Sequence, residues 1–407
     1  MTIPIRRKLF LENLYLINAT IIFEDSLVRQ GFIHIKEEKI VSMDDMENCP
    51  HLSATDKVFD CTGKQYVIPG MIDIHVHGAA GFDFMDGKHE AFEGIAQALA
   101  KEGITSFLAT TMTNPVQQIN ETLKNLAEYR AKSNGPGIPE MIGIHLEGPF
   151  INKEQKGAQP EDCIISPNAD LFKQWQRLSG NAIKIITYSP ELDEGFELLN
   201  NLKKLKVIPS MGHTNATYDE ANSAIIQGVT HATHLFNGMK SFHHRDPGVV
   251  GSAILNDDVY VEIIPDGIHF HPDLLKLIVK MKTLEKVLVI TDGMRATGMP
   301  DGEYDLGGQR VSVRDGKCSL ISHDSLAGSI LTMNNARLNL EKWLELSIHE
   351  QVLITSTNQA KRLEILSHKG SISVGKDADI VVIGQNGEVE LTICRGAIAY
   401  ERSGAFL

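Results

Sequence analysis

Two features of the 407-residue sequence predict an α/β fold, a (β/α)8 TIM-like barrel with a small β-sandwich domain built from both chain ends. Eight short apolar segments are each followed by a stretch with helical spacing, which predicts parallel strands joined by helices and the number of units that closes a barrel. Segments of alternating apolar and polar residues lie on both sides of this region. Their similar character predicts that the two chain ends pair into one β domain, with the barrel inserted between them.

The domain boundaries are predicted where these patterns change. Residues 1–66 are expected to form the N-terminal part of the β-sandwich domain, because segments such as 15–23 alternate in polarity and lack amphipathic helices. Residues 67–366 are expected to form the barrel, and residues 367–407 the C-terminal part of the β-sandwich domain. Turn residues and alternation near 300–325 predict a β-hairpin insertion after the eighth strand.

The barrel strands are predicted from short apolar runs that end at turn residues. In chain order they are 71–78, 104–113, 141–149, 183–191, 206–214, 230–237, 259–267 and 287–294. Between them, apolar residues such as Phe92, Ile95 and Leu99 recur on one face of a predicted helix. Two more helices, near 329–346 and 348–361, are expected to follow the insertion and complete the barrel.

The composition excludes several classes of protein. Hydrophobic residues make up 42% and charged residues 22%, which is typical of a globular protein. A net charge of -13 argues against a nucleic-acid partner, and no stretch reaches the ~18 uninterrupted apolar residues of a membrane helix. The five cysteines stand singly, and Glu12 and Asn13 interrupt the apolar run near the N-terminus. We therefore expect a cytoplasmic protein without a signal peptide or a disulfide framework.

Ionisable side chains recur where the predicted barrel strands end. They are His75, His77, His145, Glu147, His213, His234 and Asp292. The carboxyl ends of barrel strands form one rim, and active sites lie at that rim because the loops there leave strand-end side chains exposed. The positions of these residues therefore indicate a functional site.

The spacing of His75 and His77 places both imidazoles on the same face of a strand. By itself, such a pair is more typical of surface or buried structural histidines. With the carboxylate of Glu147 and the later histidines, it completes the nitrogen and oxygen ligand set that suits Zn or Fe(II). Asp292 follows a buried apolar run, and its carboxylate could take a proton from a metal-bound water and return it to a leaving amine.

The order of the motifs carries a resemblance to a known family. The chain resembles the amidohydrolase superfamily, and within it the sugar-phosphate deacetylases, through PGMIDIHVHG, HLEGPF, GHTNAT, THLFNGM, RDPG, DGIH, ITDGMRATG and LAGS. Near the C-terminus, GSISVGKDADIVVI is similar to the strand that closes the β-sandwich of that superfamily. The similarity covers nearly the whole chain, which makes it far more specific than any single motif.

The resemblance implies an activity and its catalytic residue. The activity is metal-dependent hydrolysis of the acetamide of N-acetylglucosamine 6-phosphate to glucosamine 6-phosphate and acetate, in amino-sugar catabolism and the recycling of cell-wall sugars. A metal-bound hydroxide would attack the carbonyl, with Asp292 as the general base that takes the proton and then as the general acid that protonates the amine.

The resemblance also implies the metal ligands. Glu147, His213 and His234 would be the principal ligands of a divalent transition metal, Zn or Fe(II), with one or two ions per subunit. His75 and His77 would belong to a second position, where Asp292 could also bind. In many members of the superfamily, a carboxylated lysine on the fourth strand bridges the two metal ions. Here Lys184 stands only at the start of the fourth predicted strand, so Glu147 is the better candidate for the bridging ligand.

The implied substrate contacts surround these ligands. They are Ala158, Gln159, Asn237, Gly238, Arg245, His269, Leu326, Ala327 and Gly328. Arg245 and His269 match positions that bind the phosphate, partly across the interface of a homodimer, while a surface ion pair of Arg245 with Asp246 is the alternative. Gln159 stands where some family members have a histidine, so its role stays open.

Two other functions compete with this hypothesis. Another amidohydrolase, such as a cyclic amidase or a deaminase, would keep the metal site but would not need Arg245 to bind a phosphate. A metal-free scaffold or binding protein would be expected to lose the ligands, and here each ligand is present. Metal analysis and the effect of replacing Arg245 would separate these functions.

Overall fold

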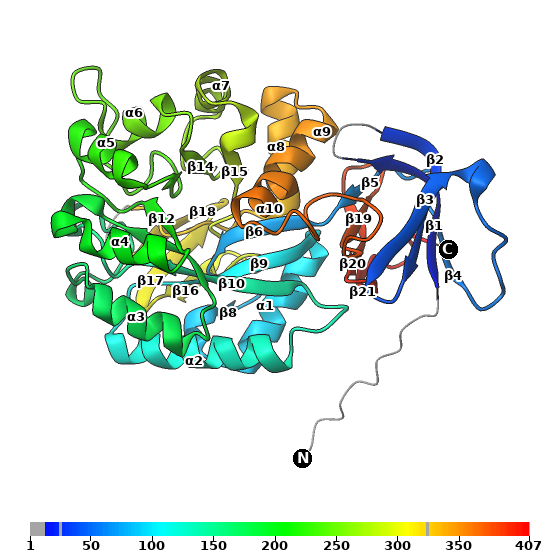
Figure 1. The fold of residues 1–407 in the computed structure, drawn as a ribbon, viewed down its shortest axis with the longest axis horizontal. Helices are drawn as coiled ribbons and strands as arrows, with labels where there is room; N and C mark the ends of the chain where they lie inside the picture. Colours follow the sequence, from blue (N-terminus) through cyan, green and yellow to red (C-terminus); the bar gives the residue numbers. More distant parts are fainter. Residues whose placement is uncertain (1–12, 24–26, 323–324, 407) are drawn as a thin grey trace, which may run out of the picture.

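The computed structural model describes residues 13–23, 27–322 and 325–406. They form a barrel of parallel strands surrounded by helices, with a smaller sheet domain beside it (Figure 1). The predicted fold class is therefore confirmed. Among the described residues, no helix is both long and apolar enough to cross a membrane.

Eight parallel strands make the barrel, and each overlaps one predicted segment. They are β6 (Met71–Val76), β9 (Ile104–Thr111), β10 (Glu140–Glu147), β11 (Ile183–Tyr188), β12 (Ile208–Met211), β13 (His231–Ala232), β14 (Tyr260–Ile263) and β15 (Val287–Val289). The first and last strands meet through backbone hydrogen bonds from His77 N to Gly293 O (2.8 Å) and from Asp292 N to His75 O (2.9 Å). These bonds place His75, His77 and Asp292 next to one another.

Helices cover the outside of the barrel. They are α1 (His89–Lys101), α2 (Val116–Lys132), α3 (Ala169–Leu178), α4 (Glu197–Lys204), α5 (Tyr218–Gln227), α6 (Gly248–Leu255), α7 (Pro272–Met281) and α8 (Met333–Leu344). In α1, the predicted apolar face of Phe92, Ile95 and Leu99 is buried in the main core. Helix α5 begins at a capping box, in which the Thr217 and Glu220 side chains satisfy backbone N-H groups of the first turn.

The second closing helix predicted near 348–361 is divided into three parts. Helix α9 (Ile348–Val352) and helix α10 (Asn358–Arg362) flank a π-helical turn, Leu353–Thr357. Gln359 in α10 donates to Val289 O at the end of β15, at 3.1 Å. This contact fastens the last helix to the last barrel strand.

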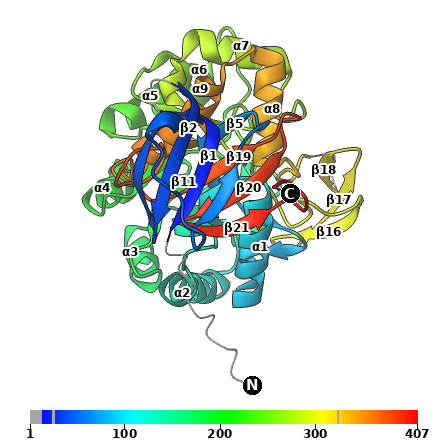
Figure 2. The ribbon, with the colours of Figure 1, turned by 90° about the vertical axis from the view of Figure 1, so that its right-hand side faces the viewer.

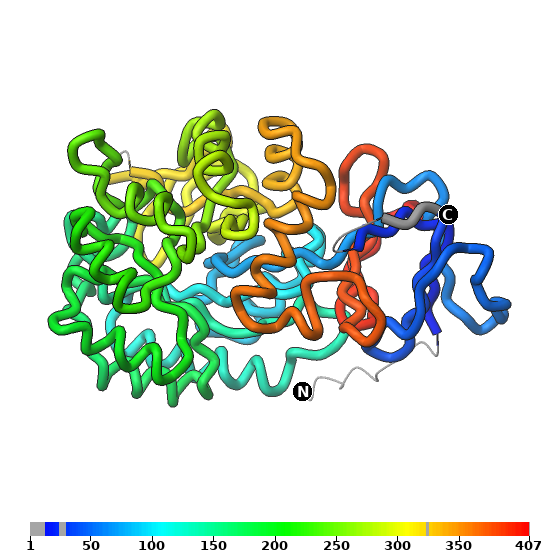
Figure 3. Tube along the Cα trace, turned by 45° about the horizontal axis from the view of Figure 1, so that its top comes forward, coloured from blue at the N-terminus to red at the C-terminus, as the bar shows by residue number. Residues whose placement is uncertain are grey.

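The small sheet contains strands from both ends of the chain. They are β1 (Leu14–Ile22), β2 (Leu27–Lys36), β3 (Lys39–Asp45), β4 (Lys57–Asp60), β5 (Tyr66–Pro69), β19 (Ile380–Ile383), β20 (Val389–Cys394) and β21 (Ala397–Glu401). Strand β19 pairs antiparallel with β5, so the late strands lie beside the early ones (Figures 2 and 3). The boundary predicted at residue 66 falls at the start of β5. The predicted residues 1–12, 24–26 and 407 lie outside the described residues.

The insertion predicted near 300–325 contains three strands in its described part. They are β16 (Gly302–Leu306), β17 (Gln309–Arg314) and β18 (Lys317–Leu320), in an antiparallel sheet, while residues 323–324 lie outside the described residues. A separate small hairpin, β7 (Gly78–Ala79) with β8 (Phe82–Asp83), follows the first barrel strand. Leu306, where β16 ends, reaches the cavity at the mouth of the barrel.

A buried ionic cluster joins the barrel to the segment that leads into β19. The ammonium of Lys369 lies 2.8 Å from Glu140 at the start of β10, 2.6 Å from Asp379 and 3.2 Å from Asp377. The Lys369 side chain is 2% exposed. Burial opposes its charge, but Asp379 and Glu140 outweigh that effect and raise the pKa of Lys369. Lys369 is therefore the buried cation that these three carboxylates share, while Arg395 lies 3.8 Å from Glu140 and Lys39 lies 2.6 Å from Asp377.

Candidate active site

A cavity of about 310 Å³ lies at the carboxyl ends of the barrel strands. Its walls carry five of the ionisable residues predicted for the site, namely His77, Glu147, His213, His234 and Asp292. Each of these five lies at the carboxyl end of a barrel strand or within three residues after it, as the sequence predicts. The loops after the strands therefore bring distant parts of the chain to one place.

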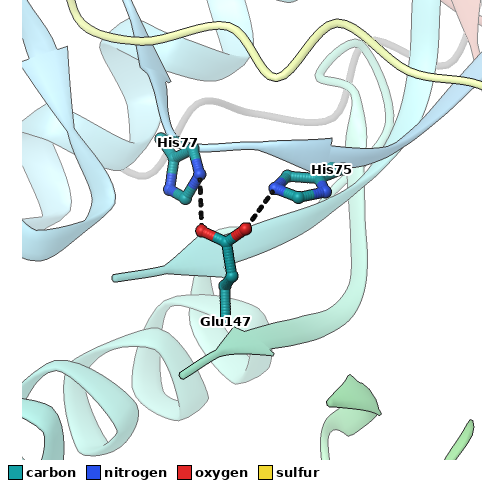
Figure 4. A group of neighbouring side chains, drawn as sticks. All are labelled: His75, His77 and Glu147. Carbon is teal, nitrogen blue, oxygen red and sulfur yellow. Dashed lines mark ion pairs between the residues drawn. The ribbon is translucent and has the colours of Figure 1, made fainter. Parts of the chain in front are cut away.

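Glu147 is the centre of the polar cluster. Its Oε1 atom lies 3.4 Å from His75 Nε2, 3.2 Å from His213 Nε2 and 3.1 Å from His234 Nε2. Its Oε2 atom lies 3.3 Å from His77 Nε2 (Figure 4). Two groups of potential metal ligands, His75 with His77 and His213 with His234, therefore share this one carboxylate.

The tautomers of His213 and His234 indicate a cation site. Their Nδ1 atoms donate to the carbonyls of Gln155 (2.8 Å) and Asn237 (3.0 Å), so in neutral rings each Nε2 carries a lone pair. These two Nε2 atoms lie 3.2 Å apart, and both face the Glu147 carboxylate. Three lone-pair atoms so close together repel one another unless a cation lies between them. The arrangement therefore fits a divalent metal whose histidine ligands are oriented by backbone carbonyls.

The second group of ligands places histidines next to two carboxylates. His77 Nε2 lies 3.3 Å from both Glu147 Oε2 and Asp292 Oδ1. Burial opposes the charge of His77, but hydrogen bonds to Asp292 and Glu147 outweigh it and raise the pKa of His77 to about 9. Burial alone would raise the pKa of Asp292, but His77 and His75 hold it below its usual range. The Asp292 carboxylate is therefore ionised at neutral pH and able to accept a proton.

Three residues of the site have a left-handed backbone conformation. The φ angles are 48° at His213, 29° at His234 and 49° at Asp292. Such angles are uncommon outside glycine and cost about 1–3 kcal/mol each, so the surrounding structure must hold them. Asp292, for example, is held by its N-H bond to His75 and by a bond from Ser329 N to its carbonyl (2.8 Å). The barrel therefore fixes these side chains at a conformational cost.

Gly238 shows how closely the loops pack around the ligands. A Cβ atom at this position would lie 2.9 Å from His213 Nδ1, and the φ of Gly238 is +57°. Any side chain there would strain the backbone and displace the His213 ring. The glycine is therefore required by the position of the His213 ring.

The predicted substrate contacts divide into two groups. Ala158, Gln159, Asn237, Gly238, His269, Leu326 and Gly328 line the cavity. Ala327 is buried beside them, whereas Arg245 is exposed and is not among the described residues that line this cavity. Its guanidinium lies 2.8 Å from His244 Nε2, and Asp246 pairs with Lys240 instead. Asp246 therefore forms its ion pair with Lys240 and not with Arg245, the alternative considered from the sequence.

Gln159 has a specific contact that the sequence did not predict. Its side-chain amide donates to Glu147 Oε2 at 2.7 Å, and its side-chain carbonyl accepts from Thr113 N at 2.8 Å. The Gln159 side chain is 3% exposed. The residue therefore orients the central carboxylate as well as forming part of the cavity wall.

Sequence reasoning missed several residues of the site. Glu262, in β14, accepts from His75 Nδ1 at 3.0 Å and is fully buried. A signal was present, because a single charged residue inside an apolar strand needs a buried partner. The cavity wall also contains Met112, Gly157, Phe236, Leu306 and Ser325. These residues have no such signal, since apolar and small residues are common in loops.

His145 has a structural role, although it was noted at the same rim. Its Nδ1 lies 3.1 Å from the carbonyl of Ile74, and its Nε2 lies 2.7 Å from the Thr187 hydroxyl. Burial lowers the pKa of His145 to about 3, so the ring is neutral at physiological pH. Both of its ring nitrogens are occupied by these contacts.

Comparisons with known proteins agree with the geometry. The model of the amidohydrolase family matches residues 66–399. The chain is 42% identical over 390 residues to an N-acetylglucosamine-6-phosphate deacetylase of Bacillus subtilis, which covers 96% of this chain and 98% of the relative.

Solved structures give the same result. A deacetylase of the same name from Pasteurella multocida has a TM-score of 0.88 at 28% identity, covering 95% of this chain and 99% of the other. The Mycobacterium smegmatis deacetylase, solved as a variant in complex with N-acetyl-D-glucosamine-6-phosphate, has a TM-score of 0.86 at 26% identity, with the same coverage. The family model alone matches the whole barrel and part of the small sheet. This chain therefore belongs to the amidohydrolase family.

Proposed function

We propose that the protein hydrolyses the acetamide of N-acetylglucosamine 6-phosphate and releases acetate and glucosamine 6-phosphate. The observation that carries this proposal is the position of Glu147, whose carboxylate faces the lone pairs of His213 and His234 beside the ionised Asp292. The names of the relatives in Bacillus subtilis and Pasteurella multocida support the choice of substrate. The pathway context that we infer is amino-sugar catabolism and the recycling of cell-wall sugars.

The ligands proposed for the metal are those that the geometry groups. Glu147, His213 and His234 would hold the principal ion, and His75 with His77 would hold a second one that shares Glu147. We propose Zn or Fe(II), with one or two ions per subunit, because nitrogen and oxygen ligands suit both metals. When bound, such an ion polarises the acetamide carbonyl and lowers the pKa of water.

Asp292 is proposed to move the proton in both halves of the reaction. Its carboxylate accepts a proton from the water that attacks the carbonyl carbon. It then donates this proton to the amide nitrogen as the C-N bond breaks, so that the amine leaves in neutral form. His77 Nε2 lies 3.3 Å from Asp292 Oδ1, so the proposed second metal position and the proposed proton carrier adjoin each other.

The phosphate is proposed to bind at the open side of the cavity. His269 lines the cavity, and its Nδ1 bonds to Asp266 at 2.6 Å, which orients the ring. We propose that Arg245 reaches the phosphate across the interface of a homodimer, because it is exposed and lies outside the wall of its own cavity. A cation of this kind is needed in a protein whose net charge is -13.

The first test measures acetate release from N-acetylglucosamine 6-phosphate before and after removal of metal with a chelator. The purified protein is expected to release acetate, to lose this activity with the chelator, and to regain it when Zn or Fe(II) is added back under anaerobic conditions. Metal content is measured in each sample. Protein that contains metal after reconstitution but releases no acetate would reject the proposed substrate, and activity without metal would reject the proposed site.

The second test replaces Arg245 with Ala. The KM for the phosphosugar is expected to rise by about 10- to 100-fold, because a hydrogen bond between charged groups contributes about 1.5–3 kcal/mol. The KM for unphosphorylated N-acetylglucosamine should stay within about twofold of its original value. Arg402→Ala, which removes a partly exposed arginine of the small sheet domain that pairs with Glu388, is the control. An unchanged KM for the phosphosugar would place the phosphate elsewhere and favour an amidohydrolase of another substrate class.

Location and redox state remain predictions. All five cysteines are free in the structure, with Cys61, Cys318 and Cys394 buried. Free thiols are typical of proteins from reducing compartments. We accordingly propose a cytoplasmic enzyme, to be checked by localisation of the tagged protein.

A further inference from the structure

Glu262 is a buried carboxylate behind the proposed metal site. It lies in β14, is 0% exposed, and is not among the described residues that line the cavity. Its Oε2 atom lies 3.0 Å from His75 Nδ1 and 3.2 Å from the backbone N of His234, and its Oε1 lies 3.0 Å from His231 Nε2. Glu262 therefore contacts one ligand of each proposed metal position, together with a third histidine outside the site.

Arg362, on the far side of His231 from Glu262, fixes the tautomer of the His231 ring. The guanidinium Nε of Arg362, in α10, donates to His231 Nδ1 at 3.2 Å, and its Nη2 donates to the Thr230 hydroxyl at 2.8 Å. Since His231 Nδ1 accepts a hydrogen bond, the proton of its neutral ring lies on Nε2 and points at Glu262. Arg362 also packs against the Tyr260 ring at 5.0 Å, which restricts its movement. The contacts of Arg362 in α10 therefore fix the direction of the hydrogen bond from His231 to Glu262.

Two donors, His231 Nε2 and the backbone N of His234, therefore point at different oxygens of Glu262, with His75 Nδ1 as the third partner. An ionised carboxylate can accept from all three. A glutamine would present an amide N-H to at least one donor. His231 cannot relieve that conflict by changing tautomer, because its Nδ1 would then face the Arg362 N-H with a proton of its own. The side chain at position 262 must consequently accept hydrogen bonds at both of its terminal atoms, as a carboxylate does.

We propose that Glu262 is a positioning residue that keeps the proton of His75 on Nδ1 and so presents His75 Nε2 to the second metal ion. Arg362 and His231 act through Glu262 by fixing the direction of its hydrogen bonds. The lone pair of His75 Nε2 then faces Glu147 Oε1 at 3.4 Å and Asp292 Oδ1 at 3.6 Å, where the second ion would share Glu147 with the first. This inference rests on the proposed function for the metal site, but not on the identity of the substrate.

The test is the metal affinity of the Glu262→Gln variant. Metal-free protein is titrated with Zn in competition with a coloured chelator, and the two equivalents are resolved. We expect the second equivalent to bind about 10- to 100-fold more weakly, the range seen when groups that orient metal ligands are removed. The first equivalent should change less, because Glu262 contacts His234 only through its backbone. Glu102→Gln, a half-buried carboxylate at the end of α1, is the control and should bind both equivalents normally.

Several outcomes would overturn the proposal. Unchanged affinity for both equivalents in Glu262→Gln would do so, and so would a wild-type protein that binds only one ion. If the variant does not fold, the wild-type protein still decides: ¹⁵N-histidine NMR must show the Nδ1-H tautomer at His75 and the Nε2-H tautomer at His231. The reverse tautomer at either ring would contradict the proposed chain of hydrogen bonds.

The assay of acetate release separates this proposal from the proposed function. Two tightly bound ions that depend on Glu262, in a protein that releases no acetate, would support the positioning role and reject the substrate. Acetate release by the wild type, together with normal metal binding by Glu262→Gln, would support the substrate and reject the positioning role.

Discussion

Replacing Asp292 with Asn is expected to lower kcat for acetate release by about 10²- to 10⁴-fold, the usual contribution of a general acid-base group. Asparagine has nearly the shape of the carboxylate but cannot take a proton from water or return it to the amine. The KM should change little, because Asp292 acts on the reacting atoms. Steady-state kinetics with the phosphosugar measure both constants, and metal analysis of the same sample shows whether the principal ion is retained.

A buried carboxylate outside the proposed proton transfer provides the control for this change. Asp193 is 6% exposed and accepts hydrogen bonds from the first turn of α4, at Leu198 N and Leu199 N. Asp193→Asn should cost stability but leave kcat within about threefold of its original value, a change of less than 1 kcal/mol in the barrier. An Asp292→Asn variant that holds the metal and keeps more than about a tenth of kcat would show that another group transfers the proton.

Replacing Lys369 with Met is expected to lower the free energy of unfolding by about 3–5 kcal/mol at neutral pH, because it removes the buried cation from Asp379, leaves Glu140 with only the more distant Arg395, and leaves Asp377 with only the exposed Lys39. Urea unfolding of the metal-loaded protein measures this loss. Lys39→Met is the matched control, since Lys39 pairs with the same Asp377 from a side chain that is 47% exposed. An exposed pair contributes about 0–1 kcal/mol, so the control should unfold almost as the wild type does.

The loss caused by Lys369→Met should become smaller as the pH falls. Burial would raise the pKa values of Glu140 and Asp377. Lys369 with Arg395 holds the pKa of Glu140 below its usual range, and Lys39 with Lys369 holds the pKa of Asp377 below its usual range. A carboxylate with a lowered pKa stabilises the fold above its unfolded pKa of about 4, and this contribution is lost as the pH falls through the folded pKa. Without Lys369, only Arg395 and Lys39 oppose the effect of burial, so both pKa values are higher than in the wild type and the folded variant takes up protons more readily as the pH falls. A loss that stays constant between about pH 7 and pH 5 would contradict this account.

Local patterns were sufficient for the fold class and for the residues at the rim. A short apolar run that ends at a turn predicts a buried strand, and the carboxyl ends of parallel strands meet at one edge whatever the details of packing. Glu147 and Asp292 could therefore be placed in one site from their positions in HLEGP and VITDGM. The motif order, similar to that of one family, then added the roles expected for them.

The lengths of elements were less predictable. Strand β13 contains only His231–Ala232, although the predicted segment runs over 230–237. The chain turns early there because His234 has a φ of 29° and its ring is held by the carbonyl of Asn237. The described part of the insertion similarly has three strands, where a hairpin of two was expected. Such details depend on packing against neighbouring loops rather than on local polarity.

The sequence by itself determined the eight strands along the chain and the type of side chain near the ends of five of them, because short apolar runs that stop at turn residues are a local pattern. Only the tertiary structure decided which partners orient those side chains. His75 meets Glu262 across 187 positions of the chain, and Gln159 reaches Glu147 through a loop. A hydrogen bond between distant residues depends on how strands and loops close around the cavity, and no local pattern contains that information. The residues that gather at the mouth of the barrel could therefore be predicted, whereas the groups that hold them in place became visible only in the folded chain.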